Sequence, residues 1–94
     1  MPPRKYNAAK VAEAVTTLKG WKAGEDSITK TFKFKDHVAA MGFVTKVGIA
    51  AEVMDHHPDM RIVYNTVDIK LNSHDAGGVT DRDVKLAARI NEIA

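Results

Sequence analysis

Cysteine is absent from this sequence of 94 residues. The chain can therefore form neither a disulfide framework nor a zinc site built on thiolates, two devices that supplement the modest hydrophobic core of a small domain. Packing of apolar side chains, helped by oligomerisation, has to stabilise the fold instead. Hydrophobic residues make up 45% of the chain and charged residues 28%, which is typical of a globular domain and unlike a disordered chain.

Long apolar runs are scarce as well. The chain opens with polar sequence in residues 1–5, and we expect no apolar run as long as a signal-peptide core or a membrane span. We therefore expect a cytoplasmic protein that makes no contact with a membrane.

A large excess of charge of one sign is also missing, because the formal net charge is only +2. The first 35 residues are the more basic part. We interpret Lys30, Lys33 and Lys35, which are interspersed with apolar residues, as the solvent-facing side of a half-buried strand. Direct binding of nucleic acid is not expected.

The length of the chain fits one domain, residues 1–94, because two hydrophobic cores would each bury too little surface to fold. Asn7 is placed to cap a helix over residues 8–19, with Gly20 as its stop signal. Residues 23–27 carry a turn signal between Trp21 and an alternating run over residues 28–34, which predicts a β-hairpin.

A second helix is predicted from a cap at Asp36 to Met54, and its residues are nearly all apolar or small. One sheet cannot bury such a helix on every side, so we predict that a second subunit covers it. The alternative is a single broad core face, with Gly42 and Gly48 as points of close approach.

The second half of the chain repeats the alternation of strand and helix signals. Pro58 ends the apolar helix, and residues 62–71 have strand composition, either as one long strand or as two interrupted near Asn65. A loop at residues 76–78 precedes Thr80 and Asp83, whose spacing resembles a capping box that starts a last helix. The order α-β-β-α-β-β-α predicts an α+β fold with helices packed on an antiparallel sheet.

Three of the four histidines, His56, His57 and His74, lie within a short stretch of the chain. An unperturbed imidazole has a pKa of about 6.5, so converging imidazoles suit general acid and base catalysis. For an isolated histidine near a helix end, a hydrogen bond and a favourable interaction with the helix dipole are the commoner explanation. Asp83 likewise has a sufficient structural role as the capping partner of Thr80.

The spacing of these residues is more specific than their composition. It runs Glu52, three residues, His56-His57-Pro58, five residues, Tyr64, nine residues, His74, eight residues and Asp83. This pattern resembles the signature of the pterin-4a-carbinolamine dehydratases. The similarity also includes Gly20-Trp21, residues 32–36, Met41-Gly42-Phe43 and Val63-Tyr64-Asn65.

The resemblance implies a four-stranded antiparallel sheet with helices packed on one face, assembled into homodimers or homotetramers. It implies the dehydration of 4a-hydroxytetrahydropterin to quinonoid dihydropterin, with the pterin as substrate and no cofactor. The catalytic residues would be His56, His57 and His74. The residues expected to bind the substrate are Glu52, Asp55, Pro58, Asn72, Ser73, Asp75 and Asp83.

Individual roles follow from the needs of an elimination, which protonates the leaving hydroxyl and removes a proton from a ring nitrogen. We expect His57 and His74 to act on the hydroxyl and its proton, and His56 to be the other acid/base partner. Glu52 or Asp55 would fix a tautomer by accepting an N–H. Polar groups around Ser73 would bind the pyrimidine-like edge of the pterin.

Two other functions compete with this interpretation. Three imidazoles with Asp55 or Glu52 could hold zinc or iron, although the helical His-x3-His pair of metalloproteases is missing, and we expect no metal. Relatives of this fold also serve as binding scaffolds, either as a dimerisation cofactor for a transcription factor or as assembly factors for carbon-fixing enzymes. The assembly factors tend to have lost the histidines that are complete in this chain, so we expect a protein partner only as an additional role.

Overall fold

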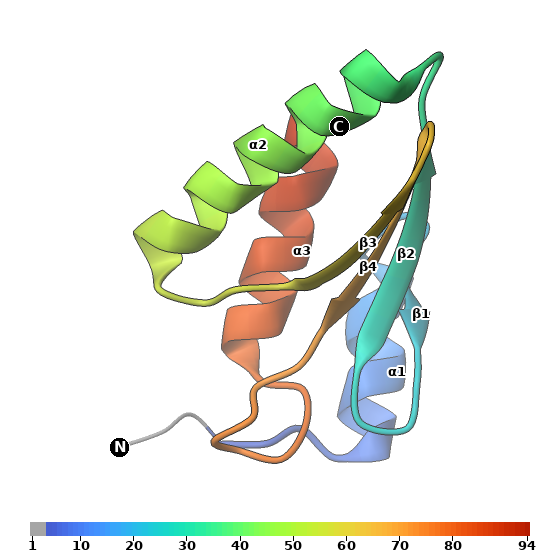
Figure 1. Ribbon diagram of the computed structural model, residues 1–94. Helices are drawn as coiled ribbons and strands as arrows, with labels where there is room; N and C mark the ends of the chain where they lie inside the picture. The colour runs from blue at the N-terminus through green and yellow to red at the C-terminus, as the bar shows by residue number, and fades with distance from the viewer. Residues whose placement is uncertain (1–3) are drawn as a thin grey trace.

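The computed structural model describes residues 4–94, and residues 1–3 lie outside this range. The elements follow in the predicted order (Figure 1). They are α1 (Ala8–Thr16), β1 (Lys22–Ala23), β2 (Ile28–Lys33), α2 (His37–Met54), β3 (Asp59–Val63), β4 (Thr66–Leu71) and α3 (Asp81–Ile93). The α+β class is therefore confirmed.

The four strands form one antiparallel sheet in the order β1-β2-β4-β3. Residues 62–71 form parts of two strands, because the chain turns at Tyr64 and Asn65, and Tyr64 has a positive φ of 52°. Asp59 at the start of β3 pairs with Lys70 near the end of β4. The α2–β3 connection and the β4–α3 loop therefore leave the sheet at the same end.

Helices α2 and α3 lie on one side of the sheet (Figure 1), and the core fills the space between them and the strands. Fully buried side chains come from both layers. They include Ile28, Val47, Val67, Ile69, Leu71, Leu86 and Ile90. Trp21 is buried as well, and its indole Nε1 donates to Asn91 Oδ1 over 3.1 Å.

The predicted helix caps are present. Asn7 Oδ1 accepts from the Lys10 backbone N–H, and Asp36 Oδ1 accepts from Ala39. Thr80 and Asp83 form the capping box at the start of α3.

Helix α1 ends at Thr16, three residues before the predicted end. The hydroxyl groups of Thr16 and Thr17 donate to the carbonyls of Glu13 and Ala14, three residues earlier. Such bonds offer the backbone an alternative to a continuing helix. Gly20, with a φ of 83°, then turns the chain toward β1.

The interpretation of Lys30 as a solvent-facing residue is wrong. Side chains alternate across a strand, so Lys30 shares the core face of β2 with Ile28 and Phe32. Its ammonium group bends out to the rim, where Nζ donates to Lys19 O and Asn91 Oδ1, both over 2.8 Å. Burial lowers the pKa of Lys30.

Helix α2 buries Ala40, Phe43, Val47 and Ala51 but leaves large apolar side chains exposed on its other side, with Val38 at 79%, Ile49 at 63% and Val53 at 83%. A Cβ atom added at Gly42 or Gly48 would meet nothing within 4 Å, so close approach within the subunit does not explain these glycines.

Helix α2 is also long and apolar enough, by length and composition alone, to cross a membrane, with a mean hydropathy of 1.3. The expectation that no run approaches such a length is therefore wrong for this segment. The helix nevertheless packs against α3 and β4.

Candidate functional site

The end of α2 directs His56 into the protein. Asp55 adopts the left-handed conformation, with a φ of 50°, and the His56 backbone N–H donates to Ala51 O over 3.1 Å. Aspartate tolerates this conformation better than most residues do. Pro58 follows and prevents the helix from resuming. The predicted contact of Asp55 with the substrate stays a prediction, but its backbone already has a structural role.

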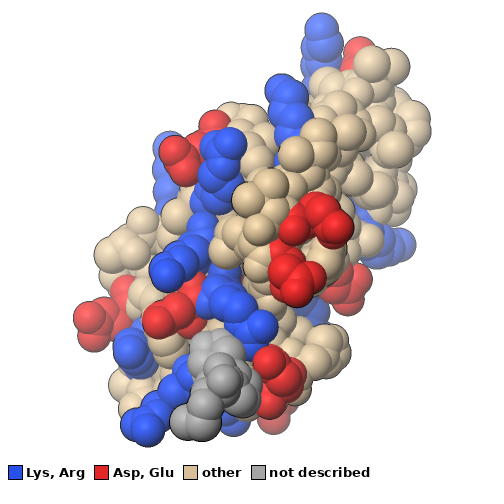
Figure 2. Space-filling model, turned by 90° about the vertical axis from the view of Figure 1, so that its left-hand side faces the viewer, with Lys and Arg blue, Asp and Glu red and all other residues tan. Residues whose placement is uncertain are grey.

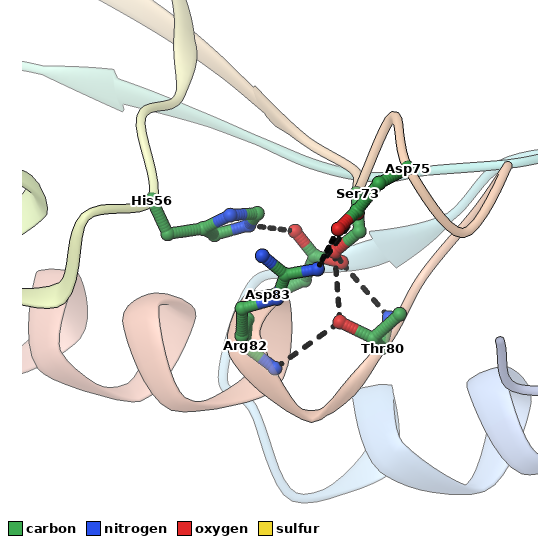
Figure 3. A network of polar contacts seen from close by, with 6 residues as sticks. All are labelled: His56, Ser73, Asp75, Thr80, Arg82 and Asp83. Atoms are coloured by element: carbon green, nitrogen blue, oxygen red, sulfur yellow. Dashed lines mark hydrogen bonds and ion pairs between the residues drawn. The ribbon is translucent and has the colours of Figure 1, made fainter. Parts of the chain in front are cut away.

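The side chain of His56 is buried and faces Asp83. His56 is 7% exposed, Asp83 is fully buried, and His56 Nε2 lies 2.5 Å from Asp83 Oδ1 (Figure 3). A carboxylate oxygen only accepts hydrogen bonds, so the imidazole donates through Nε2. The partner of the His56 ring is therefore Asp83, and neither Glu52 nor Asp55, the carboxylates expected to fix a histidine tautomer, bonds to it.

Asp83 also bonds to the loop that precedes α3. Its Oδ2 accepts from Ser73 Oγ and from the Thr80 backbone N–H, each over 2.9 Å. The hydroxyl groups of Ser73 and Thr80 lie 2.7 Å apart and complete the network in Figure 3. Asp83 occupies the third position of α3, where the positive end of the helix dipole favours an anion.

This carboxylate therefore joins three chain segments: the α2–β3 connection, the β4–α3 loop and the first turn of α3. Ser73 and Asp83 were predicted to bind the substrate. Their exposures of 2% and 0% leave no side-chain surface for direct contact. Their polar atoms are bonded to each other, to Thr80 and to His56, so the structure gives them the role of holding the site together.

The other two histidines of the predicted cluster, His57 and His74, are exposed. His57 Nε2 lies 2.7 Å from Glu52 Oε1, and the two side chains are 56% and 79% exposed. Glu52 thus orients His57, one of the imidazoles it was predicted to serve. His74 directly follows Ser73 and is also exposed, and its side chain makes no hydrogen bond to any residue in the range 4–94.

Asp75 is engaged by a residue that the sequence reasoning missed. Arg82 Nη2 contacts both Asp75 carboxylate oxygens, over 2.7 and 2.8 Å. The Arg82 guanidinium holds the pKa of the Asp75 carboxyl below its usual range. A signal for this pair was present in the sequence, because Asp75 and Arg82 carry opposite charges and lie on either side of the Gly77-Gly78 turn. Pro58 and Asn72 are partly exposed nearby in the chain, and their substrate contacts stay predictions.

Among residues 4–94, no group of three or more histidine, aspartate or glutamate side chains is arranged to hold a metal ion. A groove of about 750 Å³ lies between α2 and α3, and none of the four histidines lines it. Its lining residues are Lys46, Ile49, Ala50, Val53, Met54, Lys85, Ala88, Arg89, Glu92 and Ile93. His57 and His74 are instead exposed, and each directly follows a residue of the buried Asp83 network, His56 or Ser73.

Comparisons with known proteins identify the family of this chain. The sequence profile of the family described as "Pterin 4 alpha carbinolamine dehydratase" matches residues 4–93. A relative from Nitrobacter winogradskyi is 51% identical over 83 residues, which cover 86% of this chain and 82% of that protein. A relative from Rhizobium meliloti is 46% identical over 96 residues, covering 100% of this chain and 92% of that protein. Both carry the provisional name pterin-4-alpha-carbinolamine dehydratase.

Two solved structures are also similar. The crystal structure of a transcriptional coactivator/pterin dehydratase from Brucella melitensis has a TM-score of 0.93 and 39% identity, covering 97% of this chain and 99% of that one. A pterin dehydratase-like protein identified as a RuBisCO assembly factor in the α-carboxysome shares the fold, with a TM-score of 0.65 at 20% identity over 79% of this chain and 86% of its own. With the profile matching residues 4–93, this chain belongs to the pterin-4-alpha-carbinolamine dehydratase family.

Proposed function

We propose that this protein dehydrates a 4a-hydroxytetrahydropterin to quinonoid dihydropterin and water. The observation that carries the proposal is the position of Asp83, which bonds His56 on one side and Ser73 on the other. His57 and His74 are the next residues in these two segments, so the bonds of Asp83 hold the backbones of both histidines on either side of one buried carboxylate. Membership of the family over residues 4–93 supports the same class of reaction.

The reaction is an elimination without a redox step. The bond between carbon 4a and its hydroxyl oxygen breaks, the neighbouring ring nitrogen loses its proton, and a carbon–nitrogen double bond forms as water leaves. One group must donate a proton to the hydroxyl while another accepts the proton from nitrogen. Imidazoles can do both near neutral pH.

We assign the hydroxyl and its proton to His57 and His74, because both side chains are exposed and can reach a bound ring. Glu52 orients His57 by accepting its Nε2–H. A pair this exposed contributes little to stability, so its value lies in fixing the tautomer of His57.

We assign the remaining acid/base role to His56. Its Nε2–H donates to Asp83, which leaves Nδ1 as the accepting nitrogen. An imidazole oriented by a buried carboxylate is a recurrent arrangement in acid–base sites. The bonds from Ser73 and Thr80 keep Asp83 fixed, so they act on the reaction through His56.

The test is a spectrophotometric assay of carbinolamine breakdown. His57→Ala and His74→Ala should each lower kcat at least about tenfold, the lower end of what general acid–base catalysis contributes. Their unfolding free energies should change by less than about 1 kcal/mol, because both side chains are exposed. His37→Ala is the matched control, since His37 is exposed and bonds to Tyr64 O outside the cluster. Wild-type rates in both cluster variants would contradict the proposal.

We also infer that the exposed face of α2 is covered by a second copy of the chain, in a homodimer or homotetramer. Val38, Ile49 and Val53 form an apolar surface on the side of α2 opposite the core. Gly42 and Gly48 each cost about 1 kcal/mol relative to alanine in a helix, and nothing in the subunit requires them. Gly42 lies on the same side of α2 as these apolar side chains, so a helix packing closely there would explain both the exposed surface and this glycine.

Binding of another protein is a second candidate function. The groove between α2 and α3 has an apolar floor, with Lys46, Lys85 and Arg89 among its lining residues. Figure 2 shows lysine and arginine side chains in a band beside an uncharged area on the side of the molecule where α2 ends. The similar Brucella protein is described as a transcriptional coactivator as well as a dehydratase. Sedimentation analysis distinguishes the two: a chain that stays monomeric at micromolar concentration leaves this face free for a different partner.

A further inference from the structure

The loop between β4 and α3 has a fixed base and an exposed tip. At the base, the Ser73 N–H donates to Gly78 O over 2.8 Å, and the Ser73 carbonyl accepts from Ala76 and Gly77 over 3.1 and 2.9 Å. Gly77 has a φ of 75°, which closes the turn. His74 and Asp75 lie at the exposed tip. Burial and hydrogen bonds therefore hold Ser73 in one position, whereas the exposed side chain of His74 is held by neither.

Within residues 4–94, the ion pair of Asp75 and Arg82 is the side-chain link between this tip and α3. Arg82 follows Asp81 in the first turn of α3 and directly precedes Asp83, so its backbone is as firmly placed as the Asp83 network. Figure 3 shows its side chain reaching from α3 toward Asp75. The contact with Arg82 lowers the pKa of the Asp75 carboxyl, as expected for an ion pair.

Arg82 is also more enclosed than an ordinary surface arginine. Its Nε atom is buried and has no hydrogen-bond partner among the described residues. A buried donor without a partner is unfavourable. The inner part of the side chain is therefore enclosed, while its outer nitrogen Nη2 reaches Asp75.

We propose that Arg82 is a positioning residue, which holds the His74 loop against α3 through Asp75 and thereby places the His74 imidazole for proton transfer. This inference rests on the proposed dehydratase function. It replaces the predicted contact of Asp75 with substrate by a contact with Arg82. Arg82 itself touches neither substrate nor a reacting atom, and its effect passes through the loop.

The first experiment is a double-mutant cycle on dehydration. Arg82→Ala and Asp75→Asn should each lower kcat about fivefold, the rate equivalent of a well-placed exposed ion pair, with a smaller change in KM. The double variant should be no slower than either single variant, because the two residues act as one unit. Arg82→Lys should recover part of the rate, since an ammonium group can contact one carboxylate oxygen.

Lys33→Ala is the control, because Lys33 is an exposed cation at the end of β2 that lies away from the β4–α3 loop. It should leave kcat unchanged. If the effects of Arg82→Ala and Asp75→Asn multiply in the double variant, the two residues act separately and the proposal is overturned. Wild-type kcat in Arg82→Ala would overturn it as well.

A second readout does not depend on activity. Hydrogen exchange of the Ala76 and Gly77 amides reports opening of the loop, because both N–H groups donate to Ser73 O. Exchange should speed up in Arg82→Ala and Asp75→Asn and stay unchanged in Lys33→Ala. If the wild type shows no turnover, the proposed function fails, but faster exchange still supports the loop restraint. Unchanged exchange in both variants refutes the restraint whatever the activity.

Discussion

The substitution Asp83→Asn perturbs the centre of the site while keeping its shape. Oδ1 of Asp83 faces His56, and Oδ2 accepts from Ser73 Oγ and the Thr80 N–H. An amide NH2 group placed at Oδ2 would oppose the Thr80 N–H, so the asparagine should direct its oxygen there and its NH2 group toward His56. Nε2 of His56 must then accept, and the proton moves to Nδ1.

The cost in stability follows from the change in hydrogen-bond type. A bond to a charged group contributes about 1.5–3 kcal/mol, and a neutral one about 0.5–1.5 kcal/mol. Two bonds at Oδ2 become neutral, so Asp83→Asn should destabilise the fold by about 2 kcal/mol, which lowers Tm by roughly 10 °C in a domain of this size. Asp83→Ala would break a buried pair, costing about 3–5 kcal/mol, and is the less useful variant.

Activity should fall further than stability suggests. The altered tautomer removes the accepting nitrogen of His56, so kcat should drop at least about tenfold at temperatures where the variant is folded. The measurements are urea unfolding followed by circular dichroism and the carbinolamine assay. Asp68→Asn is the control, because Asp68 accepts from Thr31 Oγ1 in an exposed bond on the sheet. A folded Asp83→Asn variant with wild-type kcat would refute the role of Asp83 in orienting His56.

Three further predictions concern other parts of the molecule. Tyr6→Phe removes the hydrogen bond to Asp81 that raises the pKa of Tyr6 to about 12. Wild-type Tyr6 keeps its proton to a higher pH in the native state than in the unfolded state, so the wild type should lose stability relative to Tyr6→Phe as pH rises from about 10 to 12. Paired urea titrations measure this difference, and a difference between the two proteins that does not change with pH would contradict it. Val53→Asp should convert the assembled protein to monomers in sedimentation experiments, because a carboxylate would be buried at the inferred interface of α2; an unchanged mass would remove α2 from the interface. Gly42→Ala should weaken self-association, whereas a free helix face would gain about 1 kcal/mol of stability from the alanine in thermal unfolding.

The parts of the fold that were predicted from sequence depend on local signals. Asn7, Asp36 and Thr80 each cap a helix through a side chain that bonds to a backbone N–H two or three residues ahead. Such bonds need only the neighbouring residues, so a linear pattern reveals them. The solvent-facing assignment of Lys30 is wrong, because the alternation of side chains along β2 places Lys30 on the core face with Ile28. Its long aliphatic chain carries the ammonium group out of the core to Lys19 O.

The site was only partly predictable, because its contacts join distant segments. The capping box identified Asp83 and Thr80, but the bond from Asp83 to His56 spans 27 positions and depends on how β3 and β4 pair. For the same reason the sequence suggested only the nearby Glu52 or Asp55 as the carboxylate that fixes a histidine tautomer. Arg82 carries no motif, and its role depends on the shape of the loop at Asp75.

The four imidazoles provide the most direct test of where a reduced pterin binds. Their ring C–H resonances can be followed by NMR while an unreactive dihydropterin is titrated into the wild-type protein. The signals of His57 and His74 should move most, those of His56 less because its ring is buried against Asp83, and that of His37 should stay in place. Shifts that spare His57 and His74 would contradict the placement of the pterin between the α2–β3 connection and the β4–α3 loop.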